Sequence, residues 1–274
     1  MDKRNSLLKC IVGIVAAELL SVISFSLAEL IPQGNLSDMN YNTVTYFAMT
    51  VINFIGMTLI LAFCKRLDVL KDTPKGSFIK GIKISIVLLS YSIITFAINI
   101  ISCIQAHSNA VMQPKFIAIY ILALFIGAGI GEELLFRGIC MSLIRGTAGY
   151  KSRKGLIVAM TVSSSLFGLL HLANLLVTDD VIGTVGQVIY AIGIGFYLAA
   201  IYARTGNLWF NIVLHFMVDI ASLVKEIFTS SEVTVSEILG NGQLSVILIS
   251  VAIGIIFFLM GLFIIRKSKM PELI

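Results

Sequence analysis

Long runs of apolar residues, separated by short polar stretches, repeat along the whole chain. Each run is close to the roughly 20 residues that an α-helix needs to cross the hydrocarbon core of a bilayer. Polar and apolar positions do not alternate within the runs, as they would in the strands of a transmembrane barrel. The pattern therefore predicts an all-α, polytopic transmembrane helical bundle. Eight spans are expected, approximately at 8–31, 43–64, 82–104, 117–144, 156–177, 184–203, 208–228 and 244–265.

The composition agrees with a membrane protein and excludes a soluble domain with an ordinary surface. Of the 274 residues, 58% are hydrophobic and 13% are charged, whereas about 25% are charged in a typical soluble protein. We therefore interpret residues 1–274 as one transmembrane domain, since no loop offers room for a separate module. Its parts are N-terminal spans without motifs (1–104), a core that carries the polar motifs (115–225), and a last span with a basic tail (244–274).

The basic residues predict how the chain lies in the membrane. A net charge of +5 could indicate nucleic-acid binding in a soluble protein, but here the positions of the charges argue for orientation instead. If the N-terminus is cytoplasmic, every Lys and Arg except Lys115, Arg137 and Lys225 lies at the inner end of a span. Because cytoplasmic loops carry an excess of Lys and Arg, both termini are expected in the cytoplasm. Three of the four predicted outer loops contain neither residue: 32–42, 178–183 and 229–243.

Three ionisable residues interrupt the fourth predicted span. Glu132, Glu133 and Arg137 lie at its centre, where a charged side chain costs about 2.5–3.5 kcal/mol on insertion scales. Glu133 and Arg137 are four residues apart, so they share a helix face and can form an ion pair. Glu132 is rotated by about 100° and has no local partner. An acid held by arginine beside a free acid is typical of an acid/base site, although a structural charge network between helices would also explain it.

Two of the three histidines fall inside predicted spans. His171 lies in the fifth span and His215 in the seventh, whereas His107 is expected in a solvated outer loop. A lone buried histidine more often satisfies a structural hydrogen bond than takes part in catalysis. Two of them beside the unpaired Glu132 leave both interpretations open.

The seventh span carries a polar stripe, because Asn211, His215 and Asp219 recur at intervals of four residues. Asp219 could orient His215 or help to bind a metal. Carboxylates and imidazoles are suitable ligands for a zinc-like ion that keeps one position for water. The same side chains also suffice, without a metal, for a glutamate that deprotonates water. The candidate ligands are Glu132, His171, His215 and Asp219.

Three motifs in this order resemble the CPBP family of membrane proteins. They are EExxxR at 132–137, FxxxH at 167–171, and a histidine followed four residues later by a polar residue at 215–219. The family includes the type 2 CAAX prenyl proteases and their Abi and bacteriocin-processing relatives. Gly138, Asn174 and the segment 206–209 agree with the flanking positions, and the resemblance covers approximately residues 115–225.

The resemblance implies an intramembrane endopeptidase that hydrolyses a peptide bond in a membrane-associated or lipidated peptide or protein. Glu132 would activate water with the help of His171, while Glu133 and Arg137 would hold the site. His215 would bind Zn²⁺ or another divalent metal in a metalloprotease, or stabilise the oxyanion in a metal-free glutamate protease. The expected surroundings are the lipid bilayer of a bacterial cell membrane, since the chain is small, and no nucleic-acid partner is expected.

One residue departs from the family pattern, which commonly has Asn where this chain has Asp219. An asparagine donates a hydrogen bond to a developing oxyanion, and an ionised aspartate cannot. Asp219 could be protonated, could bind a metal or orient His215, or could leave the donor role to Asn211. The departure also leaves room for a non-proteolytic immunity or scaffold protein, and intramembrane acids also allow an ion- or proton-coupled transporter. For a protease we expect the site in the cytoplasmic half of the membrane, in a cavity open to the cytoplasm.

Overall fold

Eight long apolar helices make up the computed structural model, which describes residues 3–106, 109–147, 152–176, 178–228 and 243–272. Each helix overlaps one predicted span, and the described part of the chain contains no β-strand. The predicted all-α, multi-pass membrane architecture is therefore confirmed. The helices that are long and apolar enough to cross a bilayer are Ile11–Ala28, Asp38–Phe63, Ser77–Gln105, Pro114–Arg145, Arg153–Leu175, Val181–Thr205, Leu208–Ile227 and Leu244–Ile264.

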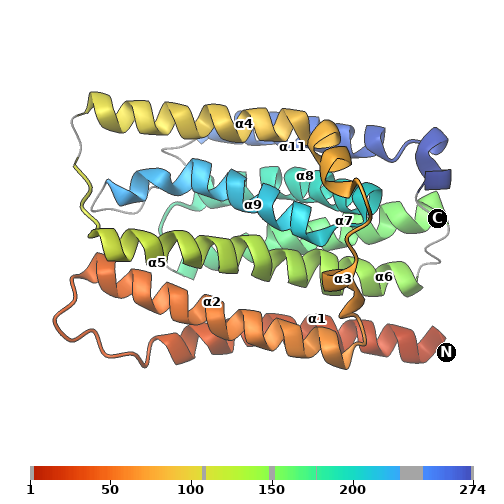
Figure 1. The fold of residues 1–274 in the computed structure, drawn as a ribbon, viewed down its shortest axis with the longest axis horizontal. Coiled ribbons are helices and arrows are strands. Elements are labelled where there is room, and N and C mark those ends of the chain that lie inside the picture. Colours follow the sequence, from red (N-terminus) through yellow and green to blue (C-terminus); the bar gives the residue numbers. More distant parts are fainter. Residues whose placement is uncertain (1–2, 107–108, 148–151, 177, 229–242, 273–274) are drawn as a thin grey trace.

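The helices lie side by side along the long axis of the molecule, and the two ends of the chain are found at the same end of the bundle (Figure 1). An even number of crossings requires this arrangement. Which end faces the cytoplasm remains a prediction from the Lys and Arg positions. His107 and most of the last predicted outer loop, 229–242, lie outside the described residues. The α-helices are α1 (Lys3–Ala28), α2 (Asp38–Phe63), α3 (Asp68–Lys71), α4 (Ser77–Gln105), α5 (Pro114–Leu124), α6 (Ser142–Thr147), α7 (Arg153–Leu170), α8 (Val181–Thr205), α9 (Leu208–Leu223) and α11 (Gln243–Ile264).

Polar side chains and one glycine set the ends of the helices that carry the polar motifs. Ser152 accepts a hydrogen bond from the backbone N–H of Gly155 (2.9 Å) at the start of α7. Asn207 begins α9 by accepting from the N–H of Phe210 (3.1 Å). Such N-caps satisfy backbone donors that have no partner within the helix. Helix α8 ends at Gly206, whose positive φ of 63° is a conformation that glycine adopts without strain.

The fourth span is continuous but not α-helical throughout. Two π-helical segments, η1 (Phe125–Glu132) and η2 (Leu134–Met141), lie between α5 and α6. The sequence predicts a long span that is tilted, kinked or continued along the surface, and the wider π-helical turns were not expected. Glu133 lies where the two segments meet. π-helical turns occur frequently at functional sites. The junction of the two π-helical segments therefore indicates the same region, around Glu132 and Glu133, as the buried charges do. Short 3₁₀ segments follow other spans: η3 (His171–Leu176), η4 (Val224–Ile227) and η5 (Lys267–Glu272).

Helix α8 is the central element of the bundle. It packs against α4, α7, α9 and α11, and 61% of its span is buried, against 17–50% for the other seven. Its closest approach is to α11, where Gly193 and Gly254 face each other. A Cβ atom added to Gly193 would lie 2.2 Å from the carbonyl oxygen of Gly254. Small residues allow this close packing of two membrane helices.

We expect Gly193→Ala to destabilise the bundle by about 1–3 kcal/mol, the usual cost of forcing extra atoms into a packed interior. The added methyl group meets backbone, which cannot rotate away. Gly138→Ala is the matched control, because its Cβ would make ordinary contact with Leu61 at 3.5 Å. The measurement is the free energy of unfolding in detergent micelles. Equal stability of the two variants would contradict the packing seen here.

Candidate active site

Glu133 and Arg137 form a fully buried ion pair in the fourth span. The Arg137 Nη1 atom donates to Glu133 Oε1 at 2.7 Å, and the two side chains are 1% and 0% exposed. Arg137 Nη2 also donates to the backbone carbonyl of Gly195 in α8 (2.8 Å). The predicted intrahelical pair is confirmed. Its second bond ties the fourth span to the most buried helix of the protein.

Helix α9 supplies two further contacts to Glu133. His215 Nδ1 lies 2.9 Å from Glu133 Oε1, and the Asn211 amide donates to Glu133 Oε2 at 3.2 Å. A carboxylate paired with arginine accepts hydrogen bonds only, so Nδ1 of His215 carries the proton in this contact. The nitrogen left for chemistry is Nε2. Glu133 thus fixes both the ring orientation and the tautomer of His215.

These contacts change the roles expected for the polar stripe on α9. The sequence suggests that Asp219 could orient His215, but Glu133 makes that contact, and Asp219 Oδ2 lies 3.7 Å from His215 Nε2. The Asn211 amide nitrogen donates to Glu133 and also to the carbonyl of Leu198 at 2.8 Å. Both of its hydrogens are therefore engaged inside the protein. Asn211 supports the buried pair and does not face a reacting group.

Glu132 lies on the other side of His215 and faces a cavity. The cavity has a volume of about 430 Å³, and Glu132, His171, His215 and Asp219 all line it. The Glu132 side chain is 29% exposed, and its Oε2 is 3.7 Å from His215 Nε2. That distance is too long for a direct hydrogen bond. The sequence leaves Glu132 without a partner, whereas the structure places a histidine from another span opposite it.

His171 reaches the same cavity from the end of α7. Its Nδ1 lies 2.9 Å from the carbonyl oxygen of Phe167. A carbonyl can only accept, so Nδ1 carries the proton and Nε2 is left as an acceptor. The Phe167 ring packs edge-on against both histidines, with centroids 5.0 Å from His171 and 5.5 Å from His215. The Arg137 guanidinium lies 5.3 Å from the centre of the same ring. Phe167 thus packs against both histidines and the buried arginine.

Polar residues outside the sequence motifs also line the cavity. Gln187 and Tyr190 come from α8 and Tyr46 from α2. The Asn174 amide donates to Gln187 Oε1 at 2.8 Å, which links η3 to α8. Gln187 could have been found, because a glutamine inside an apolar span is unusual. No pattern in the sequence identifies Tyr46.

The cavity extends away from the Lys- and Arg-rich end of the bundle. From Glu132 and His215 it reaches Asp180 at the start of α8 and Glu226 in η4. Both residues lie near the ends of spans that face the predicted outer loops. The lining residues thus extend towards the end of the bundle opposite the basic residues, and an opening to the cytoplasm stays a prediction.

The predicted metal ligands do not form a ready-made site. Within the described residues, no three His, Cys, Asp or Glu side chains are grouped so that they could hold a metal ion together. Glu132, His171, His215 and Asp219 share a cavity, but in this arrangement they do not fit an ion as a set. The chemistry below is therefore derived from the side chains alone.

Comparison with known proteins identifies the part of the chain that carries this site. Residues 114–221 match the family described as type II CAAX prenyl endopeptidase Rce1-like. The matched segment runs from α5 to α9, contains all seven candidate residues, and nearly coincides with the motif-bearing core predicted at 115–225. No curated protein sequence matches the chain. The match over residues 114–221 of this multi-pass membrane protein confirms the resemblance inferred from the motifs.

Proposed function

We propose that the protein is an intramembrane endopeptidase that hydrolyses a peptide bond in a membrane-associated or lipidated peptide or protein. The observation that carries the proposal is the cavity inside the bundle, which brings Glu132, His171 and His215 together from three spans. Hydrocarbon excludes the water that hydrolysis needs, so an enzyme of this kind requires a polar chamber at membrane depth. The family match at residues 114–221 supports proteolysis as the reaction class.

The reaction follows from the positions of the side chains. Glu132 takes a proton from water, and the resulting hydroxide attacks the carbonyl carbon of the scissile peptide bond. The carbonyl oxygen becomes an oxyanion, which needs a hydrogen-bond donor within the cavity. Collapse of the tetrahedral intermediate breaks the C–N bond, and the proton held by Glu132 passes to the leaving amine. The products are a carboxylate and an amine.

The two histidines have different places in this scheme. His171 presents Nε2 as an acceptor, which suits a group that positions the attacking water beside Glu132. His215 is locked by Glu133 through Nδ1, so its Nε2 points at the reacting groups, and in the imidazolium form it donates to the oxyanion. The buried Glu133–Arg137 pair and Asn211 hold His215 in place. We therefore class them as positioning residues that do not touch substrate.

Comparison of the peptides released from membranes tests the proposal. Membranes that contain the intact protein are compared by mass spectrometry with membranes that contain Glu132→Gln at equal abundance. Peptides that depend on the intact protein identify the scissile bond and with it the substrate. If the two peptide sets are the same, the non-proteolytic alternative, an immunity or scaffold protein that keeps the polar cluster for structure, gains support.

Asp219 is the residue with which the chain departs from the family pattern, and two substitutions define its role. We propose that Asp219, in its protonated form, acts as a hydrogen-bond donor to the oxyanion, because it lines the cavity and lies beside His215 Nε2. Asp219→Asn keeps a donor and is expected to retain cleavage. Asp219→Leu removes the donor and is expected to lower kcat by about 10²–10³-fold. Loss of cleavage in Asp219→Asn would show that the carboxylate itself is required, as a charge or as a metal ligand.

A further inference from the structure

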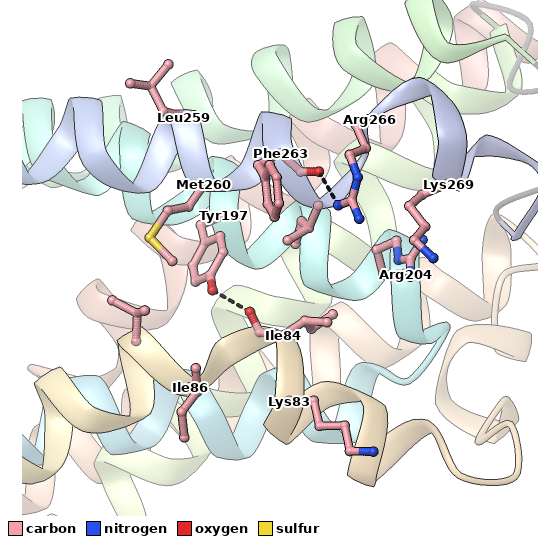
Figure 2. Close-up of a pocket in the computed structure, with 12 residues that line it drawn as sticks. Lys83, Ile84, Ile86, Tyr197, Arg204, Leu259, Met260, Phe263, Arg266 and Lys269 are labelled. Atoms are coloured by element: carbon pink, nitrogen blue, oxygen red, sulfur yellow. Dashed lines mark hydrogen bonds between the residues drawn. The ribbon is translucent and has the colours of Figure 1, made fainter.

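A second cavity lies at the opposite, Lys- and Arg-rich end of the bundle. It has a volume of about 520 Å³ and lies between α4, α8 and the end of α11 (Figure 2). Four cationic side chains line it: Lys83, Arg204, Arg266 and Lys269. No Asp or Glu is among its described lining residues, whereas the candidate active-site cavity contains several. The two cavities thus differ in the sign of their charge.

The cations come from three separate parts of the fold. Lys83 lies near the start of α4, Arg204 in the last turn of α8, and Lys269 in η5. Arg204 is only 8% exposed, so its charge is held within the protein and not at its surface. Arg266 follows α11, where its Nη1 donates to the carbonyl of Phe263 at 3.0 Å and its guanidinium lies 4.4 Å from the centre of that ring. The burial of Arg204 and these contacts of Arg266 hold two of the four charges in place.

The rest of the cavity is apolar and opens along the membrane-facing side of two helices. Ile86 and Val87 of α4 are 57% and 46% exposed, and Leu259 and Phe263 of α11 are 57% and 64% exposed. The seven residue steps from Leu259 in α11 to Arg266 just beyond it correspond to about 10 Å at helical rise. Figure 2 shows the cationic groups at one end of the cavity and Leu259, Met260 and Ile86 towards the other. The cavity is therefore amphiphilic along the direction of the spans.

Tyr197 links two of the helices that line the cavity. Its hydroxyl donates to the backbone carbonyl of Ile84, and this bond bridges α8 and α4 at the floor of the cavity (Figure 2). The bridge keeps the two helices at a fixed separation beneath the charges. The cavity is thus framed by the fold as well as by flexible side chains.

We propose that this cavity binds the headgroup of an anionic phospholipid, with the phosphate among the four cations and the acyl chains along α4 and α11. Basic pockets between membrane helices on the cytoplasmic side suit such headgroups. The general excess of Lys and Arg at an inner membrane surface accounts for cations near this end. It does not account for four of them lining one cavity from three elements, with an apolar wall beside them. A zwitterionic headgroup carries its own cation, which these residues repel.

The test uses the full-length protein, purified in a mild detergent, with phosphatidylglycerol as the probe. Binding is followed by native mass spectrometry and by the rise in the thermal unfolding temperature on lipid addition. Arg266→Gln combined with Lys269→Gln is expected to weaken phosphatidylglycerol binding about 30-fold, from about a fivefold loss for each charge. The matched control removes two exposed charges from the same end of the bundle outside the cavity, as Lys71→Gln with Lys75→Gln, and is expected to bind normally.

Three outcomes would overturn the proposal. Equal losses in both double variants would show a general surface-charge effect. Equal binding of phosphatidylcholine would show that the cavity does not select an anionic headgroup. Competition by inorganic phosphate, with the same stabilisation as the lipid, would show a site for the free anion. A second variant, Val87→Trp, keeps all four charges and fills the apolar part, so it is expected to weaken lipid binding without affecting any binding of free phosphate.

Discussion

Replacing Glu132 by glutamine is expected to abolish peptide-bond cleavage while the protein remains folded. Glutamine has nearly the same shape as glutamate but cannot take a proton from water. A positioned general base contributes about 10²–10⁴-fold to rate, so cleavage should fall by at least that range. Because Glu132 is 29% exposed to the cavity and lies outside the buried Glu133–Arg137 pair, little stability should be lost with it.

The measurement is the cleavage rate of an identified peptide substrate by protein reconstituted in lipid vesicles. Glu29→Gln is the matched control, since Glu29 is an exposed acid that follows α1 and is not among the residues that line the candidate active-site cavity. This control should cleave at the normal rate. If Glu132→Gln also cleaves at the normal rate, Glu132 is not the base and the proposed mechanism fails.

The second large effect is expected when the buried ion pair is broken. Either Glu133→Leu or Arg137→Met leaves one charge buried without its partner, which typically costs about 3–5 kcal/mol. Together, the two substitutions replace both charges by apolar side chains, and much of the lost stability should return. Cleavage should stay low in all three variants that lack part of the pair, since His215 loses its orientation when Glu133 is replaced or displaced.

A double-mutant cycle measures this coupling through free energies of unfolding in detergent micelles. The exposed pair between Arg66 and Asp68, at 3.0 Å, serves for comparison. Exposed pairs contribute about 0–1 kcal/mol, so Asp68→Ala should change stability little. Strictly additive losses for Glu133→Leu and Arg137→Met would contradict the geometry described here. So would high activity in the apolar double variant.

Much of the fold and part of the site could be predicted from the sequence, for physical reasons that act locally. Burying apolar side chains in lipid dominates the energy of a membrane span, so the apolar runs predict all eight helices. The spacing of Glu133 and Arg137 predicts their pair because residues four apart meet on one helix face. The same geometry separates Glu132 from that pair, and the structure shows it facing the cavity.

Other features depend on partners that leave no trace in a single sequence. The backbone carbonyls of Gly195 and Leu198 complete the hydrogen bonds of Arg137 and Asn211, and a carbonyl is available at every residue. The π-helical turns of η1 and η2 likewise have no simple residue pattern. Asp219 was a reasonable candidate to orient His215, because it lies one turn away. Glu133 makes that contact instead, through a tertiary approach of η1 to α9.

Counting residues along the spans could not predict whether the three candidate catalytic residues meet at one level of the membrane. Counting residues along straight spans places Glu132, His171 and His215 at different levels, which suggests that a common site needs tilted helices. In the structure Glu132 Oε2 lies 3.7 Å from His215 Nε2, and the Phe167 ring packs against both histidines. The three residues therefore face one chamber.

The dependence of Glu133 on α9 has a consequence for how the chain is made. His215 and Asn211 are synthesised about 80 residues after Glu133, so a nascent chain that is still on the ribosome holds the acid and the arginine without the groups that complete the site. Proteolytic competence arises only when the seventh span has entered the membrane and docked. A product truncated before that point would lack His215 and Asn211, and Glu133 would keep only its arginine partner.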